Sequence, residues 1–246
     1  MRPAMTRHPL RHSRPILGVV AAALTVSFTL SLPVRADSTP GRLPAPALDE
    51  TPKPGPGLQT AIFSGGCFWG VQAVFEHVKG VKEAVSGYTG GHAVNPSYEE
   101  VSSGTTGDAE SVRVTFDPAQ VSYGKLLQIF FSVALDPTEV GHQGPDWGTQ
   151  YRSELFVNGP EQARIAHAYM AQLEAAHVFG RPIATRIDPA GPFYQAEAYH
   201  QDFLFLNPDN PYIVINDLPK LDSLKALFPE SWRSTPVLVS KPTRGI

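Results

Sequence analysis

Residues 59–78 read QTAIFSGGCFWGVQAVFEHV, and this stretch decides the fold that the sequence predicts. Its first part, Gln59 to Ser64, is a short apolar run typical of a buried strand, and Gly65-Gly66 follows as a turn. From Cys67 to His77 the apolar residues recur at helical spacing, at Val71, Val74, Phe75 and Val78. The sequence therefore predicts a strand, a glycine turn and a helix that opens at Cys67.

Strands and helices follow one another irregularly along the rest of the chain. The pattern predicts further strands at four places: 81–88, 111–116, 151–157 and 183–187. Helices are expected to begin at Ser122 and Pro160, with a long loop at 135–150 and a short apolar strand and a Leu-rich helix within 212–232. This order favours an α+β fold, in which helices pack on a mixed sheet, over a regular doubly wound array.

The whole chain has 42% hydrophobic and 17% charged residues, which is typical of a globular protein with one substantial core, but its start differs from the rest. Residues 1–36 have the form of a secretory signal. A basic start precedes the apolar run from Ile16 to Leu32, and Val34-Arg35-Ala36 fits the small-residue rule for cleavage. We predict cleavage after Ala36 and export, most naturally to a bacterial periplasm. A retained membrane anchor is the alternative, because the apolar run approaches spanning length.

The remaining chain divides into three parts. We expect a Pro/Gly-rich linker at 37–57, a folded domain with a C-terminal extension at 58–232 and a disordered tail at 233–246. Cleavage would leave 15 of the 20 basic residues against 23 acidic ones, a net charge of −8. That charge argues against nucleic acid as a partner. After cleavage no stable membrane span is expected, and a monomer is the default.

Cys67 is the single cysteine of the chain, which excludes an internal disulfide and any two-thiol redox motif. A lone thiol in an exported protein is a candidate for chemistry, because exported proteins generally use thiols in pairs. At the first turn of a helix, backbone N–H groups and the helix dipole favour the thiolate. Phe68 and Trp69 can form an apolar wall beside the sulfur. An inert buried cysteine with two core aromatics is the alternative.

Five motifs in order extend this signal from residue 59 to residue 211. They are Gly66-Cys67-Phe68-Trp69-Gly70, Gly87-Tyr88-Thr89-Gly90-Gly91, Asn95-Pro96-Ser97-Tyr98, the segment 107–110, and Gly148-Thr149-Gln150-Tyr151-Arg152-Ser153. Together they resemble the peptide methionine sulfoxide reductases of the A type. The resemblance implies a two-layer sandwich related to the ferredoxin-like fold. It also implies that the S epimer of methionine sulfoxide, free or in oxidised proteins and peptides, is reduced to methionine.

The resemblance also implies roles for individual side chains. Cys67 matches the nucleophile, and Phe68 and Trp69 match the pocket for the substrate methyl group. The groups around the sulfoxide oxygen match Glu110, Tyr98 and Tyr151. An acid of the hydrogen-bonding network matches Asp146. A sulfoxide is a weak electrophile, so attack at its sulfur needs a proton or hydrogen bonds on its oxygen.

Glu110 must carry a proton at neutral pH to act as this acid. A carboxyl in an aromatic-walled pocket has its pKa raised by desolvation. We infer a proton shared between Glu110 and Cys67, so that the free thiol is not strongly acidic. The product of the first step would be a Cys67 sulfenic acid. Because the chain has no second cysteine, an external thiol must reduce it: a thioredoxin-like protein, a glutaredoxin-like protein or a small thiol. No cofactor is expected.

Three positions depart from the pattern of the family. Asp108 and Leu135 stand where histidine is common, and Trp147 is unusual beside Asp146. These departures affect the rim of the site and the substrate preference that the resemblance implies, and they leave the proposed catalytic set whole.

Two rival functions stay open on the residues alone. Cys67 could serve a cysteine hydrolase or acyltransferase, with a distant base such as His200, although such a site also needs an orienting Asn or Asp and an oxyanion hole. Alternatively, Phe68 and Trp69 could form the pocket of a non-catalytic exported binding module. A metal is not expected, because the eight histidines lack the paired spacing and the acid of a zinc helix.

Overall fold

The computed structural model describes residues 41–50 and 57–240. The predicted signal at 1–36 therefore lies outside the described residues, and its cleavage stays a prediction. Within the described ranges no helix combines the length and the apolar character needed to cross a bilayer.

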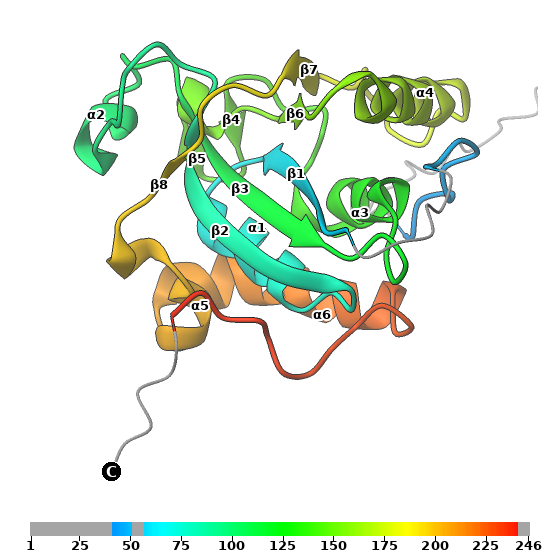
Figure 1. Cartoon of the computed structure of the whole chain (residues 1–246). Helices are drawn as coiled ribbons and strands as arrows, with labels where there is room; N and C mark the ends of the chain where they lie inside the picture. The colour runs from blue at the N-terminus through cyan, green and yellow to red at the C-terminus, as the bar shows by residue number, and fades with distance from the viewer. Residues whose placement is uncertain (1–40, 51–56, 241–246) are drawn as a thin grey trace, which may run out of the picture. The chain divides into compact units, whose positions relative to one another are not determined.

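A six-stranded mixed sheet forms the centre of the domain (Figure 1), with the strand order β7-β6-β1-β3-β2-β8. The strands are β1 (Gln59–Ser64), β2 (Val81–Thr89), β3 (Ala109–Phe116), β6 (Glu154–Val157), β7 (Arg186–Pro189) and β8 (Tyr194–Gln195). The β6–β7 pair is parallel and the other pairs are antiparallel. The predicted α+β class with a mixed sheet is confirmed.

Helices pack on this sheet, and α1 contacts β2 and β3 on one side and α6 on the other (Figure 1). The α-helices are α1 (Phe68–Glu76), α2 (Tyr98–Ser102), α3 (Tyr123–Ile129), α4 (Pro160–Ala175), α5 (Phe203–Leu206) and α6 (Leu218–Leu227). The described residues also form two π-helical segments, η1 (Phe130–Ala134) and η4 (Ile213–Asp217), and two 3₁₀ turns, η2 (Thr149–Tyr151) and η3 (Ala198–His200).

Alternation along the strands sets the two faces of the sheet. Ala61 and Phe63 of β1 point into the main core, whose buried aromatics include Phe75 and Phe130. Ile62 belongs to a small second cluster on the other face, which segment 190–193 covers. Because the main core lies between the sheet and the helices, the helix face is the one that can bury a catalytic group.

Residues 41–50 pack on the domain, although their composition is that of a free linker. Leu43 is buried, its backbone N–H donates to Ser132 (3.2 Å), and its carbonyl accepts from Gln128 (2.7 Å). Asp49 caps α3 by accepting from the Ser122 hydroxyl (2.5 Å) and the Gly124 N–H (2.9 Å). This segment forms no core of its own, but side chains of the domain satisfy its backbone.

Residues 233–240 also have fixed partners, in place of the expected disorder. The Arg233 N–H donates to the His77 carbonyl (2.8 Å). Buried Asp202 accepts from the Val239 N–H (2.9 Å) and the Ser240 N–H (2.7 Å). The last part of the predicted tail, 241–246, lies outside the described residues.

Two local predictions are wrong. Residues 135–150 are not a plain loop, because they contain the hairpin of β4 (His142–Gln143) and β5 (Asp146–Trp147). The short strand expected within 212–232 is η4, which leads directly into α6. Its β-branched residues suggested a strand, but Ile213 and Asp217 are buried while Ile215 between them is exposed, which is a helical and not an alternating pattern.

Candidate active site

Cys67 lies at the junction of β1 and α1, as the sequence predicts. Gly66 has a φ of +84°, and a Cβ there would lie 2.7 Å from the Gln143 side chain, so the turn needs glycine for two reasons. Cys67 is the N-cap residue of α1, with 8% of its surface exposed. The thiol is therefore buried but keeps a small exposed surface.

Glu110 lies directly beside the start of this helix. Its Oε2 accepts a hydrogen bond from the Phe68 N–H at 3.0 Å, and the residue is 2% exposed. Burial raises the pKa of Glu110 to about 8, against the lowering effect of the Phe68 N–H, and the Asp146 charge adds to the rise. The predicted acid therefore holds its proton at neutral pH.

The Cys67 thiol is less acidic than a helix start alone would make it. Burial raises its pKa well above the usual value, and the charges of Glu110 and Asp217 raise it further. The Trp69 N–H and Lys220 lower it by less. Desolvation therefore outweighs the helix N-terminus, which by itself favours the thiolate. The inference of a weakly acidic thiol beside a protonated Glu110 agrees with these directions.

Tyr98 and Tyr151 come from two different helical segments, but the charges of Glu110 and Cys67 act on both. Tyr98 begins α2, where its N–H donates to Glu197 (2.9 Å), and Tyr151 ends η2, where its carbonyl accepts from the Gly66 N–H (3.2 Å). Burial raises the pKa of both phenols, and the charges of Glu110 and Cys67 are among the further causes for each. The structure therefore brings both phenols to the thiol and the acid as neutral hydrogen-bond donors.

The two aromatics after Cys67 occupy different environments. The Phe68 ring is buried, with centroids 5.8 Å from Tyr88 and 5.0 Å from His200. Trp69 is half-buried and stacks on Phe203 with 3.7 Å between centroids. The position of Phe68 is that of a core residue under the site, whereas Trp69 keeps the exposed ring surface that an apolar substrate group could meet.

Asp146 lies on β5, where its Oδ2 accepts a hydrogen bond from the Tyr212 hydroxyl at 2.5 Å. Burial raises the pKa of Tyr212, and the charges of Cys67 and Asp146 are among the further causes. The sequence analysis did not identify Tyr212, which enters the site from the C-terminal extension.

Three further residues of the site escaped the sequence analysis in their present roles. Buried Asp217 and Lys220 form an ion pair of 3.0 Å beside α1. A signal was available, since an acid and a lysine at i,i+3 interrupt an otherwise apolar segment. His200 packs its ring 4.5 Å from that of Tyr98.

The same histidine fits the hydrolase reading poorly. His200 Nδ1 accepts from Trp69 Nε1 at 3.0 Å, burial lowers its pKa, and among the described residues no hydrogen bond joins it to Cys67. The described ranges also contain no group of three or more His, Cys, Asp or Glu arranged to hold a metal ion.

The three departures from the family pattern have clear surroundings. Asp108 accepts from the Gly91 N–H at 2.9 Å, and Leu135 packs on Gly65. Trp147 is 74% exposed and stacks on His142, 4.4 Å between centroids. These residues border the site and leave Cys67 and Glu110 in place.

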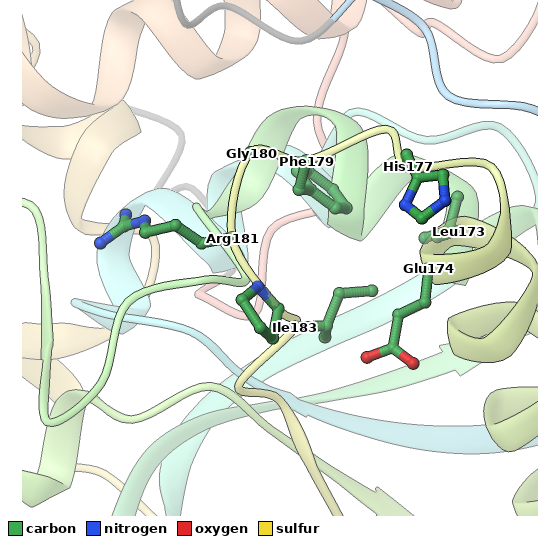
Figure 2. A pocket seen from close by; sticks show the side chains of 8 residues that line it. Leu173, Glu174, His177, Phe179, Gly180, Arg181 and Ile183 are labelled. Atoms are coloured by element: carbon green, nitrogen blue, oxygen red, sulfur yellow. The ribbon is translucent and has the colours of Figure 1, made fainter.

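A separate cleft of about 420 Å³ lies between the end of α4 and the segment that follows it (Figure 2). Figure 2 shows Glu174, His177 and Arg181 among its lining side chains. None of the residues predicted to form the site lines this cleft.

Comparison with known proteins agrees with this geometry. Residues 59–231 match the family model for peptide methionine sulfoxide reductase. A protein of Mesorhizobium japonicum named peptide methionine sulfoxide reductase MsrA 2 is 58% identical over 187 residues, which cover 76% of this chain and 96% of that protein.

Two solved structures share the fold. Methionine sulfoxide reductase A of Corynebacterium diphtheriae superposes with a TM-score of 0.53 and 37% identity, over 68% of this chain and 83% of that one. Mxr1 of Saccharomyces cerevisiae in its reduced form superposes with a TM-score of 0.55 and 32% identity, over 64% of this chain and 91% of that one. With its thiol at a helix start, its buried acid and its two phenols, the chain belongs to the peptide methionine sulfoxide reductase family, in its A type.

Proposed function

We propose that the protein reduces methionine-S-sulfoxide, free or in oxidised proteins and peptides, by attack of Cys67 on the sulfoxide sulfur. One observation carries the proposal. Glu110, a buried carboxyl with a pKa of about 8, accepts a hydrogen bond from the Phe68 N–H, directly after the only cysteine of the chain. A protonated acid and a nucleophilic sulfur at one helix start are what sulfoxide reduction requires.

The first step transfers one oxygen atom. Glu110 gives its proton to the sulfoxide oxygen while the Cys67 sulfur bonds to the sulfoxide sulfur, and the thiol proton passes to the Glu110 carboxylate. The S–O bond of the substrate and the new S–S bond then both break. The oxygen moves to the Cys67 sulfur as a hydroxyl, and the electron pair of the S–S bond stays on the methionine sulfur. Methionine leaves reduced, and Cys67 becomes a sulfenic acid.

The surrounding groups orient the sulfoxide. Tyr98 and Tyr151, whose raised pKa values keep them as phenols, are placed to donate to the oxygen as negative charge develops there. Trp69, with Phe68 beneath it, would receive the methyl group. The bond from Tyr212 to Asp146 holds that carboxylate at the border of the site.

The second step needs a thiol from outside the chain, because Cys67 has no partner cysteine. The thiolate attacks the Cys67 sulfur, and hydroxide leaves and takes up a proton as water. A second thiol then breaks the mixed disulfide and releases Cys67 reduced. A thioredoxin-like protein, a glutaredoxin-like protein or a small thiol can supply these two electrons, and no bound cofactor takes part in the cycle.

The predicted export would place this repair activity outside the cytosol. The basic start, the apolar run and the cleavage sequence before residue 37 are the grounds for this part of the proposal. We place the mature enzyme, as a monomer, in a bacterial periplasm. Comparing the N-terminus of the protein in periplasmic and membrane fractions tests it: a chain that begins at Asp37 and is free in the periplasm is the expected result.

A single-turnover experiment tests the activity. The mature protein is incubated with a methionine sulfoxide peptide and no reductant, and methionine is counted per enzyme while a sulfenic-acid reagent traps Cys67. One equivalent of methionine with trapped Cys67 is expected. Hydrolysis of an activated ester without trapping would support the hydrolase reading instead, and ligand binding without either product would support a binding module.

The rate of this burst is expected to fall as pH rises through about 8, because the raised pKa of Glu110 means that the acid form is present below that value and lost above it. Well above it, the rate should drop about tenfold per pH unit. Stopped-flow or quenched measurements across the range check this. A profile that stays flat from acid to alkaline pH would remove the shared proton from the mechanism.

A further inference from the structure

An ion pair from the C-terminal extension lies against α1, the helix that begins at the thiol. Asp217, the last residue of η4, is fully buried, and its Oδ1 accepts from the ammonium of Lys220 on α6 at 3.0 Å. The Lys220 side chain is 19% exposed, so both charges are largely shielded from water. A pair of this kind is held in one geometry by its surroundings and not by chance contact at the surface.

Gly70 places this pair against the first turn of α1. A Cβ at Gly70 would lie 2.1 Å from Asp217 Oδ1 and 2.8 Å from Lys220 Nζ, so any larger residue there would displace the ion pair. Gly70 is three residues after Cys67, the N-cap, and N-cap side chains turn toward this same first turn. The glycine therefore brings both charges to the helix end that carries the sulfur.

A buried ion pair such as Asp217–Lys220 contributes little to folding stability by itself. Asp217 Oδ2 is buried and has no hydrogen-bond partner among the described residues. Leaving such an oxygen without a partner destabilises the fold, and more so when it is charged. A pair that only joined the extension to the domain would be better replaced by apolar residues. Both charges also act on the neighbouring Cys67 thiol, which points to an electrostatic role for the pair.

The charges around Cys67 make the contribution of Lys220 distinct. The groups that interact electrostatically with the thiol come from six elements or their ends: Glu110 on β3, Tyr98 on α2, Tyr151 on η2, Tyr212 before η4, Asp217 on η4 and Lys220 on α6. Asp146 on β5 acts on the same phenols. Of these groups only Lys220 carries a positive charge.

We propose that Lys220 stabilises the Cys67 thiolate during its attack on the sulfoxide, and that Asp217 holds Lys220 in place for this purpose. The inference rests on the proposed function. Lys220 acts through Cys67 as a positioning residue and does not touch the substrate. Its positive charge partly replaces the hydration that a thiolate loses on burial, whereas Asp217 opposes ionisation. The pair therefore keeps the resting thiol protonated but able to ionise.

Alkylation of the single cysteine by iodoacetamide measures the thiolate directly, without any sulfoxide. At about pH 9, Lys220→Met should react about threefold to tenfold more slowly than the wild type. Asp217→Asn, which removes the negative charge but keeps an oxygen for Lys220, should react faster by a similar factor. The double variant should fall between the two single ones.

Three comparisons separate this effect from damage to the fold. Lys220→Arg should keep the wild-type rate, and so should Lys225→Met, an exposed lysine of the same helix. Lys220→Gln serves as a second neutral variant if the methionine variant has a lower melting temperature. In the methionine burst, Lys220→Met should lower the maximal rate and leave the half-saturating substrate concentration unchanged.

Opposite directions of change are the decisive result. If both single variants change alkylation in the same direction, or if neither changes it while the fold is intact, Lys220 has no electrostatic role. The alkylation result is independent of reductase activity. A wild type that forms no methionine would therefore defeat the proposed function alone, and the alkylation series would still decide the role of the ion pair as a charge beside Cys67.

Discussion

Replacing Cys67 by serine is expected to abolish the methionine burst. The chain has no other cysteine, so no second sulfur can take the oxygen. A serine hydroxyl is a far weaker nucleophile than a thiolate and cannot form a sulfenic acid, so a loss of about 10³-fold or more is expected. Counting methionine per enzyme in a single turnover, without reductant, measures it.

The fold should survive this change, because serine has nearly the size of cysteine and the N-cap position accepts it well. Circular dichroism and the melting temperature provide the check. Methionine released by well-folded Cys67→Ser at more than a few per cent of an equivalent would mean that another group attacks the sulfoxide.

Glu110→Gln is expected to slow the burst by roughly 10² to 10⁴, the usual range for loss of a general acid. Glutamine keeps an oxygen that can accept from the Phe68 N–H, so the helix start should stay in place. Its amide cannot deliver a proton as a carboxylic acid does. The decline above about pH 8 should disappear together with the rate, because the group that titrates there is gone.

A matched change tests whether the position matters. Glu83→Gln alters an exposed acid on β2, in the same sheet but away from the helix start, and should leave the burst rate within about twofold. Activity of Glu110→Gln within a few-fold of the wild type would remove Glu110 from the mechanism, and Tyr98 or Tyr151 would then be the proton donor to examine.

The sequence predicted best what depends on near neighbours. β1 spans Gln59–Ser64 as expected, and Ser122 caps α3, because strand runs and caps are properties of a few adjacent residues. The predicted site residues Tyr98 and Tyr151 lie near enough to Cys67 and Glu110 for these charges to act on their phenols, but only their motif context indicated this. Nothing local in either tyrosine distinguishes it from a packing residue.

What could not be predicted depends on contacts across the chain. Tyr212, Asp217 and Lys220 reach the site because α6 packs against α1, and the pattern of their own segment does not encode that contact. How strongly burial acts on the Cys67 thiol also depends on contacts across the chain. A helix dipole contributes about 0.3–1 kcal/mol, whereas burial can shift a pKa by up to about 3–5 units, and burial is set by the whole fold.

The two end segments have a practical consequence for anyone who trims the gene. The stretch shared with the family is 59–231, but the cohesive unit reaches from residue 41 to residue 240. Cutting at the shared limits would remove the partners of the Gln128 and Ser132 side chains at one end and those of the Asp202 carboxylate at the other. Recombinant versions should therefore keep both flanks, since the shorter form would leave the side chains of Gln128, Ser132 and Asp202 without these hydrogen-bond partners.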